Sequence, residues 1–275
     1  MSISVGTNPA SLNAQRNLGS TQRALGSNLA KLSSGMRINE AADDAAGLGI
    51  SERLKAQIRG MSQASRNAND GVSMIQVAEG AMNEQAGIMT RLRELAVQAS
   101  NGTLGTQERG YIDTERTSLV QELDRISTVT EYNGVAMLGA NAGTISMQVG
   151  IHGTGNDRID VSFTATDSGT LGVGALDFSS ATSAQAALDT IDTAIDRLST
   201  SRASIGSSQN RLVVTMNNLP VAHENLSAAN SRIRDVDVAE ETASMTRNQI
   251  LSQAGVAVLA QANQLPQTAL SLLRG

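Results

Sequence analysis

Few side chains in this sequence could carry out acid–base or nucleophilic chemistry. The chain has two histidines, His152 and His223, and no cysteine. His152 lies in a Gly-rich stretch typical of a turn, and His223 falls on the apolar face of a long helical repeat. No thiol and no Glu-x-x-His pattern completes a metal site with either of them. We therefore interpret both histidines as turn or packing residues.

Two short motifs resemble ligand loops but lack the residues that such loops need. Segment 235–241 holds four carboxylates, yet it has neither the central glycine nor the alternating ligands of an EF-hand. Acidic residues there favour a helix start. The Gly-rich segment 169–174 lacks the Lys-Ser/Thr end of a phosphate loop. The sequence thus predicts no catalytic residue, no metal site and no cofactor, and we do not expect an enzyme.

Composition narrows the possible partners. The net charge is −5, the cationic residues are nineteen Arg and only Lys31 and Lys55, and there is no basic run. Nucleic-acid binding is therefore not expected. No apolar stretch has the length of a membrane span, and the first twenty residues lack the pattern of a cleaved signal peptide. Aromatic residues make up 1% of the chain, which favours thin layers of packed helices over a thick core.

Both ends of the chain carry apolar residues at coiled-coil spacing. Near the N-terminus leucines recur every seven residues, and near the C-terminus a similar lattice spans residues 238–273. An apolar period of 3.5 residues predicts a helix that needs a partner helix. We expect these two segments to pair with each other or with copies of the chain. The candidate assembly residues are Leu18, Leu25, Leu29, Leu32, Met245, Val256, Leu259, Leu270 and Leu273.

Longer helices are expected between these ends. Apolar residues recur at sevens from Leu54 to Ala96, a third helix covers about residues 106–130, and another apolar repeat runs from 188 to 233. Alternating apolar residues around a Gly-rich turn predict a β-hairpin within about 134–180. Pro220 and Pro266 should kink or end their helices.

The predicted fold class is mainly α. It consists of a long antiparallel helical bundle or coiled coil with a small β-hairpin region at one end and a paired terminal-helix domain at the other. The expected domains are 1–44 with 235–275, which form the terminal pair, and 45–234, which form the bundle.

Four segments also resemble a known family. Residues 29–60, 66–84 and 91–103 closely resemble the N-terminal signature of bacterial flagellins, and residues 224–273 resemble the C-terminal signature. The resemblance implies a subunit that polymerises with itself into the extracellular flagellar filament for motility. It further implies export through the flagellar type III apparatus without a cleaved signal peptide. An export chaperone, a cap protein and hook-associated proteins are the implied partners.

The middle of the chain departs from larger members of that family. Only about residues 133–183 stand where larger flagellins carry outer domains, so we expect a minimal flagellin with a smooth, thin filament. Two alternatives remain open at this point: a hook–filament junction protein, which resembles flagellin at both ends, and a secreted enzyme with flagellin-like ends. The second would need a catalytic insert larger than this middle segment.

The resemblance also assigns three surface positions. Arg91, Leu95 and Glu115 match positions through which flagellin monomers are recognised by the innate immune receptor Toll-like receptor 5. Arg91 and Leu95 are four residues apart and are expected to share one helix face. The native role expected for these positions is packing between neighbouring protofilaments.

Overall fold

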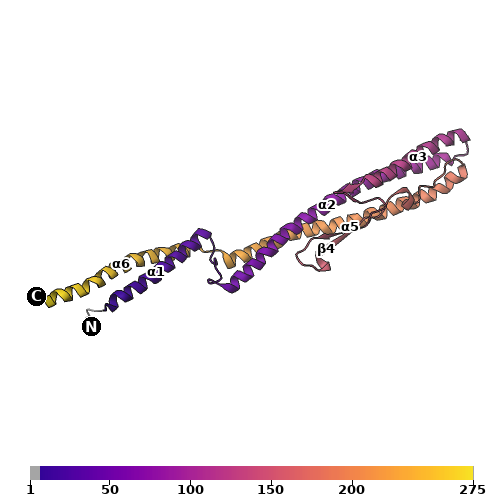
Figure 1. The fold of residues 1–275 in the computed structure, drawn as a ribbon. Helices are drawn as coiled ribbons and strands as arrows, with labels where there is room; N and C mark the ends of the chain where they lie inside the picture. Colours follow the sequence, from indigo (N-terminus) through magenta and orange to yellow (C-terminus); the bar gives the residue numbers. More distant parts are fainter. Residues whose placement is uncertain (1–6, 275) are drawn as a thin grey trace. The chain divides into compact units, whose positions relative to one another are not determined.

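A computed structural model describes residues 7–274 of the chain, with side chains described for residues 7–264. The described part is mainly helical, as predicted (Figure 1). The helices are α1 (Pro9–Ser34), α2 (Ala45–Ala99), α3 (Thr106–Val129), α4 (Ser168–Leu171), α5 (Ala181–Arg234) and α6 (Val238–Arg274). The strands are β1 (Glu131–Tyr132), β2 (Val135–Ala136), β3 (Thr144–Gln148) and β4 (Arg158–Ser162). None of the helices in this part has the length and hydropathy of a membrane span.

The chain forms two compact units, each described here by itself. Unit 1 comprises Met1–Ala56 and Asn225–Gly275, and unit 2 comprises Gln57–Glu224. The division falls inside α2 and α5, whereas the sequence placed the domain boundaries at the polar joints before α2 and after α5.

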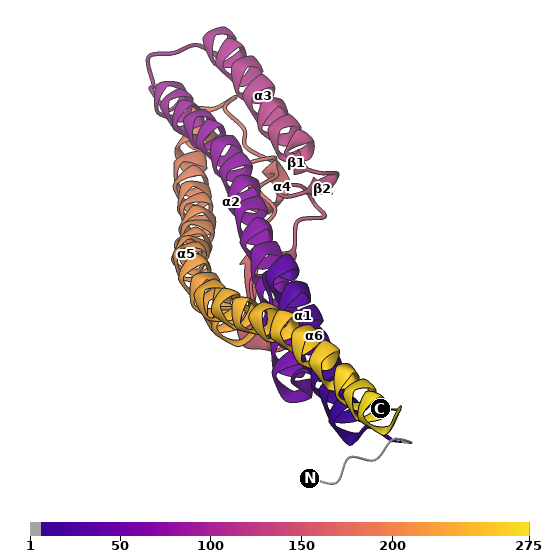
Figure 2. The same cartoon turned by 90° about the vertical axis from the view of Figure 1, so that its left-hand side faces the viewer.

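Unit 2 is a helical bundle with one contiguous apolar core. Figure 2 shows α3 and α5 on either side of α2. The apolar residues that recur every seven positions along α2 face the core, and five of these predicted positions are buried. Those positions and the main core residues from α3 and α5 are Ala68, Ile75, Met82, Met89, Ala96, Ile112, Leu123, Ile191, Leu198, Ile205 and Leu212.

Two antiparallel hairpins cover part of this bundle. The predicted hairpin is present as β3–β4, in which Ile145 pairs with Val161 and Met147 with Ile159. Ile159 and Val161 are buried, because alternate residues of β4 face the core. A second hairpin, β1–β2, precedes it and was not predicted.

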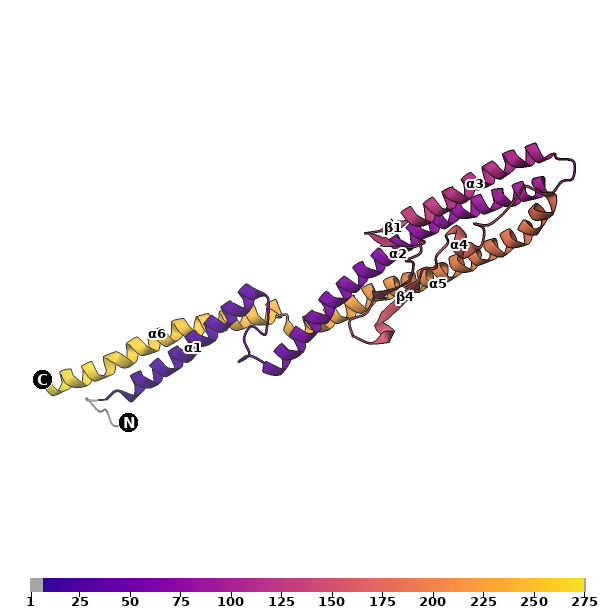
Figure 3. The ribbon, with the colours of Figure 1, turned by 45° about the vertical axis from the view of Figure 1, so that its right-hand side comes forward.

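Unit 1 is an antiparallel pair of helices, α1 and α6, which we call the terminal pair (Figure 3). Near one end Asn8 Nδ2 donates to the Ala262 carbonyl at 2.7 Å, and near the other Asn248 Nδ2 donates to Asn28 Oδ1 at 2.8 Å. Gly35, with φ of 70°, ends α1 in the left-handed conformation that glycine favours. The antiparallel pairing of the chain's two ends agrees with their matching heptad patterns.

The two prolines do not end their helices. Pro220 lies inside α5 and Pro266 inside α6, and both helices continue for two turns or more beyond them. Pro220 is exposed, and its ring removes one backbone hydrogen bond of α5. Of the two expected outcomes, a kink or an end, the end of the helix at Pro220 does not occur.

Candidate assembly surfaces

The terminal pair is held together along its length by polar side chains. Ser11 Oγ donates to Asn263 Oδ1 at 2.8 Å, and Asn28 is buried between the helices, where it also donates to Glu241. Buried apolar side chains are scarce in this unit. Among its described residues they are Ala14, Ile38 and Ala262. So small a core contributes little free energy of unfolding by itself.

The structure locates seven of the nine predicted assembly residues. Leu18, Leu25, Leu32, Met245 and Leu259 are half-buried, and Leu29 and Val256 are 52% and 53% exposed. Leu18 lies against Gly255, where a Cβ would come within 3.3 Å of Leu18 Cδ1, so glycine permits close helix approach. The side chains of Leu270 and Leu273 lie outside the described residues.

The terminal pair exposes more large apolar side chains than the heptad lattice singled out. We call the following residues, each between 50% and 61% exposed, the exposed apolar set: Leu12, Leu29, Val238, Ile250, Leu251, Val256 and Val258. Sequence reasoning did not name Leu12, Ile250, Leu251 or Val258, because a single heptad stripe marks only one helix face. Their apolar character on an otherwise polar helix was the feature of the sequence from which their role at a surface could have been predicted. Exposed apolar surface of this extent is typical of an interaction site.

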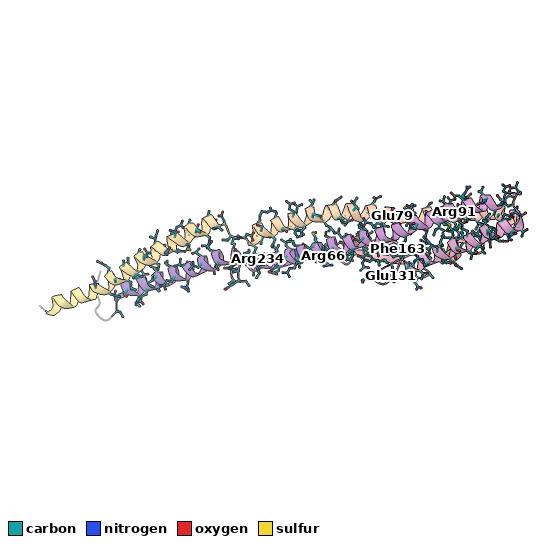
Figure 4. All side chains as sticks on the ribbon, turned by 90° about the horizontal axis from the view of Figure 1, so that it is seen from above. Arg66, Glu79, Arg91, Glu131, Phe163 and Arg234 are labelled. Atoms are coloured by element: carbon teal, nitrogen blue, oxygen red, sulfur yellow. The ribbon has the colours of Figure 1, made fainter. Side chains whose placement is uncertain are left out.

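A network joins the segment after α1 to the segment between α5 and α6. Met36 and Asp235 form an antiparallel bridge, and Arg37 N donates to the Arg234 carbonyl at 2.7 Å. The Arg234 side chain contacts Met36 Sδ at 3.0 Å and forms an ion pair with Glu52 (Figure 4). Sequence reasoning missed this network, since none of its residue types is unusual at a polar joint.

The structure separates the three predicted receptor positions. Arg91 on α2 pairs with Glu115 on α3 at 2.8 Å and with Glu94 at 2.9 Å, and all three side chains are substantially exposed (Figure 4). The hydrogen bonds that Arg91 donates to Glu94 and, next in size of effect, to Glu115 raise the pKa of Arg91. Leu95 is 1% exposed and lies in the bundle core. Only Arg91 and Glu115 of the three thus present side chains to solvent.

A second exposed ion pair links α2 to α5. Arg93 Nε donates to Asp192 Oδ1 at 2.6 Å, and this hydrogen bond lowers the pKa of Asp192. Arg91 and Arg93 therefore connect the middle helix of the bundle to both of its neighbours. Exposed pairs of this kind add little stability and mainly set which side chains face each other.

The surface around β3–β4 offers grooves but no catalytic arrangement. A groove of about 470 Å³ lies between the hairpin loop and α5, lined by residues that include Asn156, Arg158, Arg211 and Val214. His152 lies nearby, with Nδ1 4.0 Å from Asp157 Oδ1. Among the described residues, no group of three or more His, Cys, Asp or Glu could hold a metal ion.

The chain combines a helical bundle that has an apolar core with a terminal pair that exposes apolar side chains. These features define the class of helical subunits of larger assemblies. Comparison with known proteins makes the class specific. Residues 5–142 match the family described as bacterial flagellin N-terminal helical region, and residues 188–273 match bacterial flagellin C-terminal helical region.

Individual relatives cover nearly the whole chain. Flagellin from Halalkalibacterium halodurans is 46% identical over 269 residues, which are 97% of this chain and 98% of that protein. The flagellar filament 33 kDa core protein of Treponema phagedenis is 44% identical over 281 residues, with the same coverage. The crystal structure of Bacillus cereus flagellin superposes with a TM-score of 0.51 at 28% identity and covers 56% of this chain and 88% of that chain.

The chain belongs to the bacterial flagellin family. It is a flagellin of minimal length and a structural subunit of the flagellar filament. Flagellins are a structural family, and the filament places the subunit in the extracellular flagellum.

Proposed function

We propose that this flagellin polymerises by burying the exposed apolar set of the terminal pair between copies of the chain. The observation that carries the proposal is that α1 and α6 are paired, yet leave seven large apolar side chains at least half exposed. Burial contributes roughly 25 cal/mol for each Å² of apolar surface removed from water. Contacts between copies therefore supply the stabilisation that the small internal core of unit 1 cannot.

Charged substitutions within the exposed apolar set test this role. Leu29→Asp and Val256→Asp should prevent elongation from filament seeds, because each would place a carboxylate in an apolar contact. Gln253→Asp is the matched control, since Gln253 is an exposed polar residue three positions from Val256. Sedimentation and electron microscopy measure elongation, and circular dichroism checks that the bundle is folded. Normal filaments from Val256→Asp would contradict the proposal.

The same assay separates the filament subunit from a hook–filament junction protein. We expect long filaments from the purified chain, because a propeller subunit must add to itself without limit. Short rings or capped oligomers that never lengthen would favour the junction protein instead.

We further propose that an export chaperone covers the C-terminal helix before assembly, during type III export without cleavage. Ile250, Leu251, Val256 and Val258 support this, since four exposed apolar residues on one helix need cover in a chain that has not yet assembled. Cap and hook-associated proteins are proposed to meet the same terminal pair at the filament ends. Truncation after Arg234 should abolish copurification with a flagellar chaperone, whereas deletion of residues 1–34 should not. Retained copurification after the C-terminal truncation would contradict this role.

Recognition of the monomer by Toll-like receptor 5 is proposed to involve Arg91 and Glu115. Their support is that both side chains are exposed and joined into one charged surface across α2 and α3. Leu95 would act only as a packing residue beneath them. Arg91→Ala should reduce receptor activation by purified monomer, while Arg125→Ala, which removes a comparable exposed pair with Glu122, should not. Full activation by Arg91→Ala would overturn the assignment.

A further inference from the structure

The loop between α2 and α3 contains one of the two Asn-Gly pairs in the sequence, Asn101-Gly102. The other, Asn133-Gly134, forms the turn between β1 and β2. Glycine has no Cβ, so its backbone nitrogen can approach the side chain of the preceding residue more closely than that of any other residue type. When that side chain is an asparagine amide, the nitrogen can attack its carbonyl carbon.

The surroundings of Asn101 favour this attack. Asn101 and Gly102 are both exposed, so water reaches the reacting atoms. Asn101 Oδ1 accepts a hydrogen bond from Thr103 N at 3.2 Å, which polarises the amide carbonyl and holds the side chain against the following main chain. Within the part of the chain that the structure describes, Asn101 Nδ2 makes no hydrogen bond that would retain it.

We propose that Asn101 is a site of spontaneous deamidation. The Gly102 nitrogen loses its proton to solvent and bonds to Asn101 Cγ, while the bond from Cγ to Nδ2 breaks and ammonia leaves. Water then opens the resulting succinimide ring at either carbonyl, which gives aspartate or isoaspartate. One water is consumed and one ammonia released, with no oxidation or reduction. At neutral pH the product carries one additional negative charge.

Asn133 is a slow reference within the same chain. Asn133 and Gly134 have φ values of 51° and 77°, which are those of the two central residues of a type I′ hairpin turn. The turn is closed by the Tyr132–Val135 pair and by Met137 N, which donates to the Thr130 carbonyl at 3.1 Å. Asn133 is thus held by paired strands on both sides, whereas the turn at Asn101 is closed by Leu104 N, which donates to the Asn101 carbonyl at 3.3 Å, and is not flanked by paired strands. We therefore expect ring closure to be slower at Asn133.

Deamidation at Asn101 would also disturb the hydrogen bonds that cap the end of α2. Arg109 Nε donates to the Ala99 carbonyl at 2.9 Å and its Nη2 donates to the Asn101 carbonyl at 3.0 Å, which caps the end of α2. Isoaspartate inserts a methylene group into the main chain and displaces the Asn101 carbonyl from Arg109. Loss of this cap should raise proteolytic cleavage between residues 99 and 105.

The test follows both asparagines in the purified full-length chain. The chain is incubated in mildly alkaline buffer made with oxygen-18 water, because opening of the succinimide leaves one water oxygen in the product. Peptide mass spectrometry then measures how fast the label enters each site. Asn101 should incorporate label severalfold faster than Asn133 and yield isoaspartate as well as aspartate. An equal or faster rate at Asn133 would overturn the proposal.

Gly102→Ala is the decisive variant. A Cβ at position 102 meets no atom within 4 Å and the glycine does not adopt a positive φ, so the substitution should leave the fold intact. The added methyl group hinders attack by the nitrogen, and the rate at Asn101 should fall severalfold while the rate at Asn133 stays the same. An unchanged rate at Asn101 in folded Gly102→Ala would also overturn the proposal.

Discussion

Gln85 and Thr166 form a polar contact inside an otherwise apolar bundle. Gln85 Nε2 donates to the Thr166 carbonyl at 3.3 Å, and both side chains are fully buried. Gln85 Oε1 and Thr166 Oγ1 have no hydrogen-bond partner among the described residues. Each unpaired buried group costs about 1–3 kcal/mol. The hydrogen bond fixes the segment after β4 against α2, and the two unpaired polar atoms lower the free energy of unfolding.

Replacing the unpaired hydroxyl should therefore stabilise the bundle. Thr166→Val keeps the branched shape and removes Oγ1, and we expect the free energy of unfolding to rise by about 1 kcal/mol. Urea unfolding of the two chains measures the change, with Thr164→Val, at an exposed position, as the control. A loss of stability would mean that the hydroxyl binds a buried water and contributes through it.

Asp167 should give unit 2 a dependence on acid pH. Its carboxylate caps α4 by accepting hydrogen bonds from Thr170 Oγ1 at 2.6 Å and from Gly169 N at 3.1 Å. The bond from Thr170 is the main cause that lowers the pKa of Asp167 below its ordinary value of 3.8. The folded pKa is depressed, so this contribution is complete above about pH 4 and is lost as the pH falls through the folded pKa.

Asp167→Asn separates capping from titration. Asparagine also caps helices but does not ionise in this range, so the variant should lose this part of the acid dependence of stability and keep α4. Chemical denaturation at a series of pH values from neutral to acidic measures the difference. Identical pH profiles for the two chains would show that Asp167 contributes nothing through its charge.

At the scale of the helices, periodicity predicted where the helices lie in the sequence better than it predicted what each helix packs against. The third helix was expected at 106–130 and spans Thr106–Val129, because a 3.6-residue apolar pattern directly reports a buried face. The terminal segments were expected to pair with each other or with copies of the chain. In the terminal pair Asn28 and Ser11 are buried and Leu29 is exposed. Periodicity marks an apolar face without stating whether that face meets the same chain or a copy, and this is why the exposed apolar set was incompletely named.

Contacts distant in sequence were the least predictable features. The ion pair of Arg234 with Glu52 and the Met36–Asp235 bridge join residues nearly two hundred positions apart, and nothing in either local sequence specifies the other. The burial of Leu95 beside exposed Arg91 has a similar origin. Residues four apart are offset by about 40° on a helix, and only the placement of α3 and α5 decides which of the two is covered.

Pro220 should destabilise α5. The ring removes the hydrogen bond to the carbonyl four residues earlier, and proline within a helix costs about 3 kcal/mol relative to alanine. Pro220→Ala should therefore raise the thermal midpoint of unfolding, with Val221→Ala, which is the adjacent exposed residue, as the control. Electron microscopy of the polymer would report whether filament curvature changes with it. An unchanged or lower midpoint would contradict the expected cost of proline at this position.

At the scale of the whole chain, the apolar core and the assembly residues belong to different units. Every residue of the main core cluster lies between Ala68 and Leu212, within unit 2. We expect a fragment of residues 57–224 to fold cooperatively by circular dichroism yet fail to elongate filament seeds. Full-length chain in the same seeding assay is the control. Elongation by the fragment would place the assembly contacts in the bundle instead.

The hydrogen bond between Asn8 and Ala262 spans 254 residues of sequence, and this separation has a consequence for the order of folding events. Closing so long a loop directly is entropically expensive and slow. Once the bundle has folded, Met61 and His223 line a common pocket, so the effective loop shortens to the two arms outside it. The two arms can pair only after the last residues of the chain are available, so we expect the terminal pair to form after the bundle, which leaves a delay before the assembly surface is complete.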